Sequence, residues 1–372
     1  MLHDAVGRAR TTKTGPPEEK RPMPFFKPRA RPPLRAEAVG EEAFRAGRRQ
    51  LLALGCACCA AMALAPNPAA AQSPLVQQHL AAARAAAGDD LQAYLRLGEV
   101  AAPTPGLRSA SPAELRAMAT PPPGRAFDNL AFVGSRWVTA WAITTSDGII
   151  LVDAMDNDAD AERIPDAGMR QLGLDPAQIR TLVVSHGHGD HYGGAGHFVR
   201  RYGSRVVCSE ADWTMMETGL EFDRPDWGRP PRRDLAVRDG DMIRLGDTAL
   251  EVMITPGHTM GTVTLLFDVR QGGRTHRAMM WGGTAFNFGA RADRIPRLQG
   301  YIDATARARE IAARQNVEVF LSNHNVYDEA VEKLERMRPG AANPFVIGAA
   351  ATQRALTVMH ECARATMAAW SA

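Results

Sequence analysis

The sequence predicts an α/β layered fold. Between residues 127 and 367, short β-rich runs alternate with segments of helical composition. Strands with interleaved helices are typical of a fold in which helices cover sheets. The composition, 45% hydrophobic and 23% charged, is ordinary for a globular protein and provides ample core-forming material. No run reaches the roughly 20 apolar residues of a membrane-spanning helix, so we expect no stable membrane insertion.

The elements follow from apolar patterning and from the turn residues between the runs. The predicted strands are 130–134, 137–144, 148–152, 181–185, 205–209, 242–245, 249–255, 262–267, 278–281 and 317–321. The predicted helices are 77–97 with a break near Gly88, 159–172, a stretch from Gly193, 299–314, 328–337 and 349–367. A Pro/Arg-rich loop covers 222–233.

The first 71 residues differ from the rest of the chain. Residues 1–45 are rich in Pro and Arg without apolar periodicity, which predicts disorder or an over-extended start. In residues 46–71, the pair Arg48-Arg49 precedes an Ala-rich apolar run that ends in small residues. This order is typical of an export signal cleaved after Ala71, and the paired arginines favour the twin-arginine route. We therefore expect a periplasmic or secreted protein; the alternative is an Ala-rich buried helix.

The net charge of +3 is unevenly distributed. Residues 1–71 carry 12 of the 44 Lys and Arg but only 6 of the 41 Asp and Glu. The remainder therefore carries three more acidic than basic residues, and the basic excess belongs to the N-terminus. This balance gives no reason to expect a nucleic-acid partner for the folded part.

The pattern divides the chain into an N-terminal extension, a main domain and a final helix. Residues 72–124 have helical composition followed by a Pro/Ala linker, and we expect them to pack on a domain of residues 125–340. Residues 341–372 are predicted to form a C-terminal helix on that domain. Of the five cysteines, only Cys208 and Cys362 lie beyond the predicted signal. They could form a disulfide, but two small buried side chains are the favoured interpretation.

Metal-ligand chemistry is concentrated in Ser185-His186-Gly187-His188-Gly189-Asp190-His191, directly after a predicted apolar strand. Neutral imidazole and carboxylate suit Zn²⁺, and the glycines allow a tight backbone path that turns the four side chains inward. A loop without metal would rarely collect these residues, so the motif predicts a metal site.

A zinc ion needs at least three protein ligands, so further donors must come from elsewhere. His258 in Thr255-Pro256-Gly257-His258-Thr259 and His324 in Leu321-Ser322-Asn323-His324-Asn325 both follow predicted strands, where α/β folds place their chemistry. The alternative for each is a structural histidine. We interpret the other candidates as structural: a helix-face residue at His197, a hairpin-loop residue at His276, and helical residues at His79 and His360.

These motifs, in this order, resemble the metallo-β-lactamase superfamily over residues 127–338. The resemblance implies a four-layer αβ/βα sandwich, with two β-sheets between outer helices and two zinc ions at one edge. It also implies that His186, His188 and His258 hold the first zinc ion. The ligands it implies for the second zinc ion are Asp190, His191 and His324.

One departure narrows the resemblance. Most hydrolases of the superfamily have a metal-bridging Asp late in the chain, and subclasses B1 and B2 have a Cys there. This chain instead has Trp281-Gly282-Gly283-Thr284-Ala285-Phe286. A histidine-dominated pair of sites with a hydroxyl residue at that place is similar to subclass B3. The long extension before Phe127 and the Ser322–Asn325 context differ from that subclass.

The resemblance implies a zinc-dependent hydrolase in which metal-bound hydroxide attacks a carbonyl of a small-molecule substrate, with Asp190 orienting the hydroxide. A β-lactam substrate is most favoured. The alternatives are another ester, lactone, thioester or sulfate, and, less favoured, a redox or non-catalytic metal protein. The sequence contains no Gly-x-Ser-x-Gly motif that would favour a covalent route.

Further residues are expected around the metals. Asp153 is the best candidate to hold the outer nitrogen of a ligand imidazole, and Ser185 and Thr259 are weaker ones. Thr284 and Asn325 are expected to face substrate. Aromatic walls are expected from Tyr192, Trp137 and Trp227.

Overall fold

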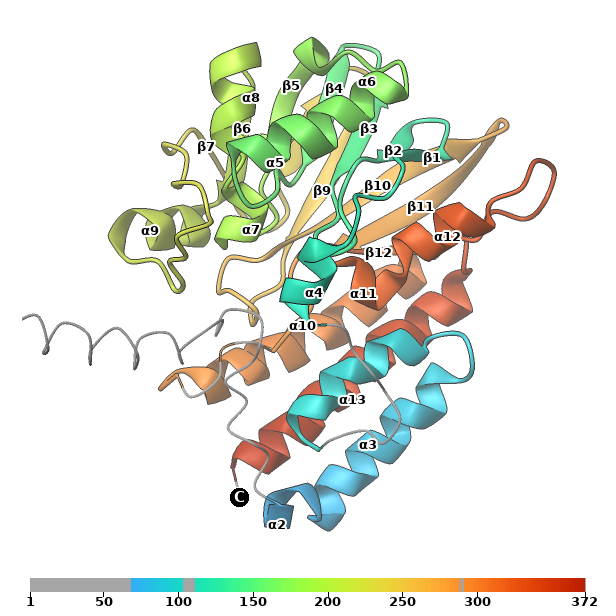
Figure 1. Cartoon of the computed structure of the whole chain (residues 1–372). Helices are drawn as coiled ribbons and strands as arrows, with labels where there is room; N and C mark the ends of the chain where they lie inside the picture. Colours follow the sequence, from blue (N-terminus) through green and yellow to red (C-terminus); the bar gives the residue numbers. More distant parts are fainter. Residues whose placement is uncertain (1–67, 103–110, 287, 289–290, 372) are drawn as a thin grey trace, which may run out of the picture. The chain divides into compact units, whose positions relative to one another are not determined.

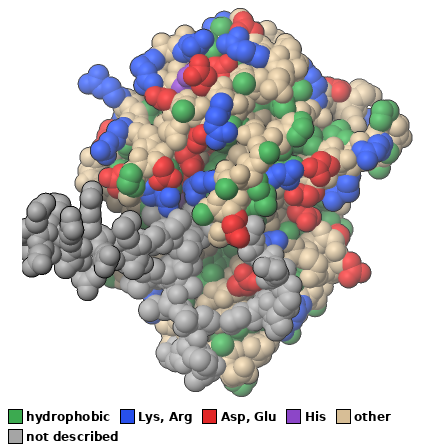
Figure 2. All heavy atoms as spheres, viewed as in Figure 1, with side chains coloured by type: hydrophobic (Ala, Val, Ile, Leu, Met, Phe, Trp, Pro, Cys, Tyr) green, Lys and Arg blue, Asp and Glu red, His purple; other side chains and the backbone are tan. Residues whose placement is uncertain are grey.

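The computed structural model describes residues 68–102, 111–286, 288 and 291–371, all within a compact unit of residues 55–372. The predicted segment 1–45 and residues 46–67 of the predicted export signal lie outside the described residues, as does the middle of the predicted linker. No helix in the described part of the chain is long and apolar enough to cross a membrane. On the face in Figure 2, basic and acidic side chains are interspersed.

Seven strands form the first sheet in chain order. The strands are β1 (Gly124–Phe127), β2 (Leu130–Phe132), β3 (Trp141–Thr145), β4 (Gly148–Val152), β5 (Ile179–Val183), β6 (Arg205–Ser209) and β7 (Leu235–Val237). The β1–β4 half is antiparallel, whereas β4 to β7 are parallel. The parallel half brings the carboxyl ends of β4, β5 and β6 to one edge of the sheet. In α/β folds, functional sites lie at such an edge.

Five strands form the second sheet in the order β12-β11-β10-β9-β8. The strands are β8 (Met242–Leu245), β9 (Thr248–Ile254), β10 (Val263–Gln271), β11 (Arg274–Trp281) and β12 (Val317–Ser322). They are antiparallel except for the parallel β11–β12 pair. The parallel pair ends both strands on the same side, next to His324.

The two sheets pack face to face. Successive side chains of a strand point to opposite faces of the sheet, so each strand has an inner face toward the other sheet and an outer face toward the helices. In β4, Ile150 and Val152 belong to a core shared with Leu265 and Met280 of the second sheet. The intervening Leu151 packs outward against the helices. A third core covers the outer face of the second sheet. Figure 1 shows the resulting helix–sheet–sheet–helix arrangement, which confirms the predicted four-layer sandwich.

Helices cover both outer faces. The first sheet carries α5 (Asp158–Ala161), the π-helical turn η2 (Glu162–Asp166), α6 (Ala167–Gln171), η3 (Pro176–Gln178), α7 (Gly189–Tyr192), α8 (Ala195–Tyr202) and α9 (Glu210–Thr218). The second sheet carries α10 (Arg294–Arg314), α11 (Asn325–Asp328) and α13 (Ala349–Trp370), whereas α12 (Ala330–Arg336) packs beside β1 against the core between the sheets. The segment before β1 forms α2 (Pro68–Ala71), α3 (Pro74–Ala87), η1 (Gln92–Val100) and α4 (Pro112–Ala117).

The helices α3 and η1 pack against α13, and η1 also contacts α11. Gly98 of η1 suits this packing, because a Cβ there would lie 2.9 Å from Leu80 Cδ2 of α3 and 3.5 Å from Cys362 Sγ of α13. Cys362 of α13 and Cys208 of β6 are both buried and free. The interpretation of two small buried side chains is therefore confirmed.

Several elements differ from the sequence predictions. The short strands β1 and β7 and the helix α9 were not predicted, although Ser209 caps α9 by accepting a hydrogen bond from Asp212 N. The predicted helix 159–172 contains a π-turn around Pro165, whose ring nitrogen cannot donate the helical hydrogen bond. His276 was expected in a hairpin loop, which is wrong: it lies in β11 and its side chain contacts Glu318 of the neighbouring strand.

Candidate metal centre

The His186–His191 motif comprises the turn after β5 and the first three residues of the one-turn helix α7. Two glycines of this turn are needed for space: a Cβ on Gly187 would lie 2.6 Å from Met215 Cε, and one on Gly189 would lie 2.4 Å from the Trp227 ring. Asp212 Oδ2 accepts a hydrogen bond from Gly187 N, which holds the turn to α9. The motif is therefore fixed on both sides by packing and by a buried carboxylate.

His258 and His324 reach the same edge from the second sheet. His258 follows β9 after Gly257, whose φ of +144° suits glycine. His324 lies two residues after β12 and is the N-cap residue of α11. The structure brings all six predicted ligands together, each less than 5% exposed; they are His186, His188, Asp190, His191, His258 and His324.

The first triad comprises His186, His188 and His258. Nε2 of His258 lies 2.9 Å from Nε2 of His186 and 3.1 Å from Nδ1 of His188. Two nitrogen ligands of a tetrahedral zinc ion with Zn–N bonds of about 2.0–2.1 Å would be roughly 3.3 Å apart. The three nitrogens therefore converge at a separation close to that of a zinc ligand set.

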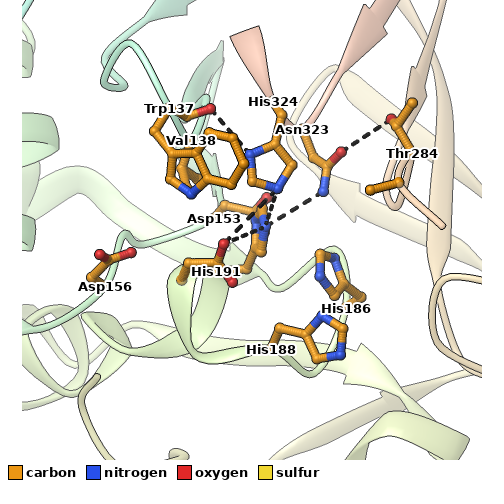
Figure 3. A network of polar contacts seen from close by, with 12 residues as sticks. Trp137, Val138, Asp153, Asp156, His186, His188, His191, Thr284, Asn323 and His324 are labelled. Atoms are coloured by element: carbon orange, nitrogen blue, oxygen red, sulfur yellow. Dashed lines mark hydrogen bonds and ion pairs between the residues drawn. The ribbon is translucent and has the colours of Figure 1, made fainter. Parts of the chain in front are cut away.

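The second triad comprises Asp190, His191 and His324. Nε2 of His191 lies 3.2 Å from Nε2 of His324, and Oδ2 of Asp190 lies 3.8 Å from the former and 3.9 Å from the latter. Ligand atoms of Asp190 and His191 also lie within 4.8 Å of a ligand atom of His186. The two triads are therefore adjacent, as Figure 3 shows for most of these residues.

The outer nitrogen of every ligand imidazole has a hydrogen-bond partner. Backbone carbonyls of Gly282, Ala285 and Trp137 serve His186, His258 and His324 at 2.8, 2.8 and 3.1 Å, respectively. Carboxylates of Asp153 and Glu221 serve His191 and His188 at 2.8 and 3.2 Å, respectively. Such partners fix the tautomer and the ring orientation of metal-binding histidines.

The tautomers test whether a cation fits the first triad. A carbonyl oxygen can only accept, so Nδ1 of both His186 and His258 must carry hydrogen. In the neutral imidazoles the Nε2 atoms of His186 and His258, which lie 2.9 Å apart, therefore carry no hydrogen, and their lone pairs point toward each other. Burial lowers the pKa of both imidazoles well below its ordinary value, with further lowering by the neighbouring histidines, which disfavours a proton between them. A metal ion fits this arrangement.

Charge makes the second triad suitable for a cation as well. Burial raises the pKa of Asp190, but the neighbouring histidines and Arg116 outweigh this effect and hold the pKa well below its ordinary value. Burial lowers the pKa of His191, but the carboxylates of Asp153 and Asp190 outweigh it and raise the pKa. Burial, with a further contribution from His191, lowers the pKa of His324 to about 3, so this imidazole is neutral at pH 7. The second triad therefore offers an ionised carboxylate and a neutral imidazole, donors that suit a metal ion.

The expected supporting residues Asp153, Ser185 and Thr259 all lie beside the ligands. Asp153 Oδ2 accepts from His191 Nδ1 and from Ser185 Oγ, both at 2.8 Å. Its backbone φ of +63° is unusual for a non-glycine residue and marks a constrained turn after β4. Thr259 Oγ1 instead donates to Asp212 Oδ2 at 2.7 Å, so it supports the turn rather than an imidazole.

Thr284 and Asn325 were expected to face substrate, and their side chains are occupied elsewhere. Thr284 is fully buried, and its hydroxyl contacts Ser322 Oγ at 2.8 Å and Asn323 Oδ1 at 3.2 Å. Asn325 Oδ1 accepts from Val331 N at 2.7 Å, because the side chain turns toward α12. A position at a strand end is visible in sequence, but the direction of the side chain is not.

Trp137 packs with its ring centroid 4.3 Å from that of His324, so it walls the second triad (Figure 3). Trp227 packs on Gly189, under the motif. Tyr192 is buried in the outer core of the first sheet. Of these three expected walls, Trp137 has the direct ligand contact.

Sequence reasoning missed four side chains near the ligands: Asp212, Glu221, Arg297 and Arg116. Asp212 holds the motif turn, as described above. Glu221 contacts His188 and Arg297. Arg116 Nε donates to Asp156 Oδ2 at 2.8 Å, and its Nη2 lies 3.8 Å from Asp190 Oδ2. A Ser-x-x-Glu capping box marks the helix that carries Arg116, but no sequence signal points it toward Asp190.

Comparison with known proteins agrees with this geometry. Residues 136–272 match the family model of the metallo-beta-lactamase superfamily. Among solved structures, a subclass B3 metallo-beta-lactamase of Bradyrhizobium japonicum aligns with a TM-score of 0.56 and 26% identity, covering 64% of this chain and 90% of that chain.

Two curated relatives are similar in sequence. A hydroxyacylglutathione hydrolase of Acidiphilium cryptum (strain JF-5) is 31% identical over 150 residues, which are 40% of this chain and 50% of that enzyme. An acyl-coenzyme A thioesterase of Gallus gallus is 28% identical over 226 residues, 53% of this chain and 75% of that enzyme. The chain thus spans half the length of the first relative. The fold, the family match and the position of the six candidate ligands agree, and the chain therefore contains a domain of the metallo-beta-lactamase superfamily, a fold it shares with the hydrolases named here.

Proposed function

We propose that this protein is a zinc-dependent hydrolase that binds two zinc ions per chain and cleaves an acyl bond of a small-molecule substrate. One observation carries the proposal: five buried imidazoles and the Asp190 carboxylate converge, and each imidazole has its outer nitrogen held. Zinc prefers these donors, and this degree of preparation is typical of metal sites.

When bound, zinc supplies Lewis acidity toward a carbonyl oxygen and lowers the pKa of water toward neutrality. The protein supplies orientation. Oδ2 of Asp190 is the oxygen nearest His191 and His324, which leaves Oδ1 to accept a hydrogen bond from the attacking water. Because the pKa of Asp190 is held low, the carboxylate is ionised and can accept this bond throughout the neutral range.

The described nucleophilic side chains support water as the attacking group. Burial raises the pKa of Cys208 well above its ordinary value and that of Cys362 to about 12, so both are thiols at neutral pH. The Ser185 hydroxyl donates to Asp153. A covalent route has no activated nucleophile among these groups.

A β-lactam is the favoured substrate. Its support is the likeness to a subclass B3 enzyme together with Thr284 at the place of the late bridging residue. A thioester is the second candidate, supported by sequence similarity to a hydroxyacylglutathione hydrolase and an acyl-coenzyme A thioesterase. Both reactions place a negative charge on the departing nitrogen or sulfur, which the second triad's metal could balance.

Metal analysis followed by substrate turnover tests the proposal. Purified protein should contain two zinc ions per chain, and a chelator should abolish turnover that added zinc restores. A chromogenic cephalosporin and S-lactoylglutathione, compared by kcat/KM, separate the two substrates. Protein that binds no zinc, or turnover that survives complete zinc removal, would overturn the proposed function.

A further inference from the structure

The first triad is backed by a buried ion pair formed by Glu221 of the 219–234 loop and Arg297 of α10. The two side chains are only 7% and 3% exposed. Among the described residues, Arg297 is the only buried arginine. Burying two charges is expensive unless each has several good partners, so such a pair beside a metal site suggests a role in that site.

The pair touches two of the three ligands of the first triad. Glu221 Oε2 lies 3.2 Å from His188 Nε2, the ring nitrogen that points away from His258. Glu221 Oε1 accepts from Arg297 Nη2, and Arg297 Nη1 donates to the His258 carbonyl at 3.1 Å. The ion pair therefore bridges two ligand segments that come from different sheets.

Arg297 is itself held in place. Its Nε donates to Asp293 Oδ2 at 2.9 Å, one helical turn earlier, and its guanidinium lies 5.8 Å from the Phe288 ring centroid. Only a planar group with several donors can serve Glu221, Asp293 and a backbone carbonyl together, which a lysine cannot do. Arg297 lies in the regular helix α10 and therefore restrains the position of the Glu221 carboxylate, which lies in an irregular loop.

We propose that Glu221 and Arg297 are positioning residues of the first metal triad: Glu221 holds His188 with Nδ1 toward the metal, and Arg297 fixes both Glu221 and the His258 backbone. Together with Asp153 at His191, each triad then has one carboxylate-supported histidine. Such a carboxylate raises the basicity of the ligand, and its removal costs about 10- to 100-fold in metal affinity. This inference rests on the proposed metal-binding function.

The same contact links the first triad to the 219–234 loop. Phe222, next to Glu221, packs edge-on against His188 with ring centroids 4.9 Å apart. A metal that orders His188 therefore also favours the observed position of this loop, and by linkage the loop favours metal binding.

Zinc affinity of E221Q measures the effect, because glutamine keeps the size of the side chain but removes the charge. Competition with a chromophoric chelator gives the two zinc dissociation constants, and cobalt absorption distinguishes a three-histidine site from a carboxylate-containing one. We expect E221Q to weaken the first triad about 10- to 100-fold and to leave the second unchanged. E217Q is the matched control, because Glu217 pairs with Arg233 on the exposed side of α9. The E217Q protein should bind zinc as wild type does.

R297K tests the other half of the pair and keeps its charge. We expect it to weaken the first triad as well, with thermal unfolding of the metal-free protein close to that of wild type. Wild-type zinc affinity in both E221Q and R297K would overturn the inference and leave the proposed function intact. Equal losses at both triads, together with a less stable metal-free protein, would show a purely structural pair and also overturn it. A wild-type protein that binds no zinc would overturn both.

Discussion

Arg116 Nη2 lies 3.8 Å from Oδ2 of Asp190, the oxygen that faces the histidines of the second triad. The arginine comes from α4, before the residues that match the family model. Its guanidinium is 5.5 Å from the Trp137 ring centroid, and that ring packs on His324. The extension before the superfamily domain therefore contributes a positive charge at the edge of the second triad.

Removal of that charge should strengthen metal binding by the second triad. In the wild-type protein the Arg116 guanidinium competes with a metal ion for Asp190, and R116M removes this cation. Unit charges a few ångström apart near a protein surface interact by several kcal/mol. We expect the zinc dissociation constant of the second triad to fall at least about tenfold, as measured by chelator competition.

R136M is the control for this prediction. Arg136 lines the same small cavity as Arg116 but pairs with Glu335 and Glu332. It should leave both zinc constants unchanged. A weaker second triad in R116M would show instead that the arginine mainly orients Asp190.

Asp153 is predicted to set the affinity of the second triad through His191. D153N replaces the acceptor at His191 Nδ1 by a neutral group that also faces the Ser185 hydroxyl. The second triad should lose about 10- to 100-fold in zinc affinity, while the first triad keeps its own. D158N, on the half-buried Asp158 that pairs with Arg200, should match wild type in the same titration.

The sequence allowed prediction of the candidate ligands and of the α/β layers because both depend on local patterns, whereas the sandwich of two sheets came from the family resemblance. His186 to His191 are contiguous, and His258 and His324 each follow an apolar strand, so the strand ends were enough to locate them. Apolar runs such as Ile149–Val152 marked the strands, and this strand is buried on both of its faces.

What could not be predicted depends on tertiary contacts. Glu221 lies in an irregular loop, and its role appears only when Arg297, 76 positions later, is packed beside it. Arg116 reaches Asp190 from a separate helix of the extension. The position of Asn325 after β12 does not reveal that its amide oxygen accepts a hydrogen bond from Val331 N of α12.

Asp190 is predicted to be required for turnover beyond its part in metal binding. In D190N the single amide oxygen can still bind the metal. The NH2 group that replaces the other oxygen cannot accept a hydrogen bond from the attacking water. We expect kcat to fall by about 10²- to 10⁴-fold at saturating zinc, the range for loss of a positioned acid–base group. The unfolding temperature of the metal-free variant should fall at neutral pH, because the lowered pKa of Asp190 means that the folded protein stabilises its carboxylate. Turnover at the wild-type rate in zinc-saturated D190N would contradict the proposed role.

Asp328 is predicted to make stability depend on pH. Burial raises its pKa to about 7, and Lys333 offsets this only in part. The native state then keeps a proton that the unfolded chain loses near its ordinary pKa of 3.8. A raised pKa contributes stability that is complete below the unfolded value and is lost as the pH rises through about 7. The free energy of unfolding of the metal-free protein should therefore decrease between pH 5 and pH 8.

In D328N, whose amide does not titrate, this decrease should be smaller by a few kcal/mol, roughly 1.4 kcal/mol for each unit of pKa difference. Urea unfolding of both proteins at the two pH values measures the difference, and Asp147→Asn, on an exposed turn, controls for the loss of a carboxylate as such. Equal pH dependence in wild type and D328N would show that Asp328 titrates normally in the folded protein.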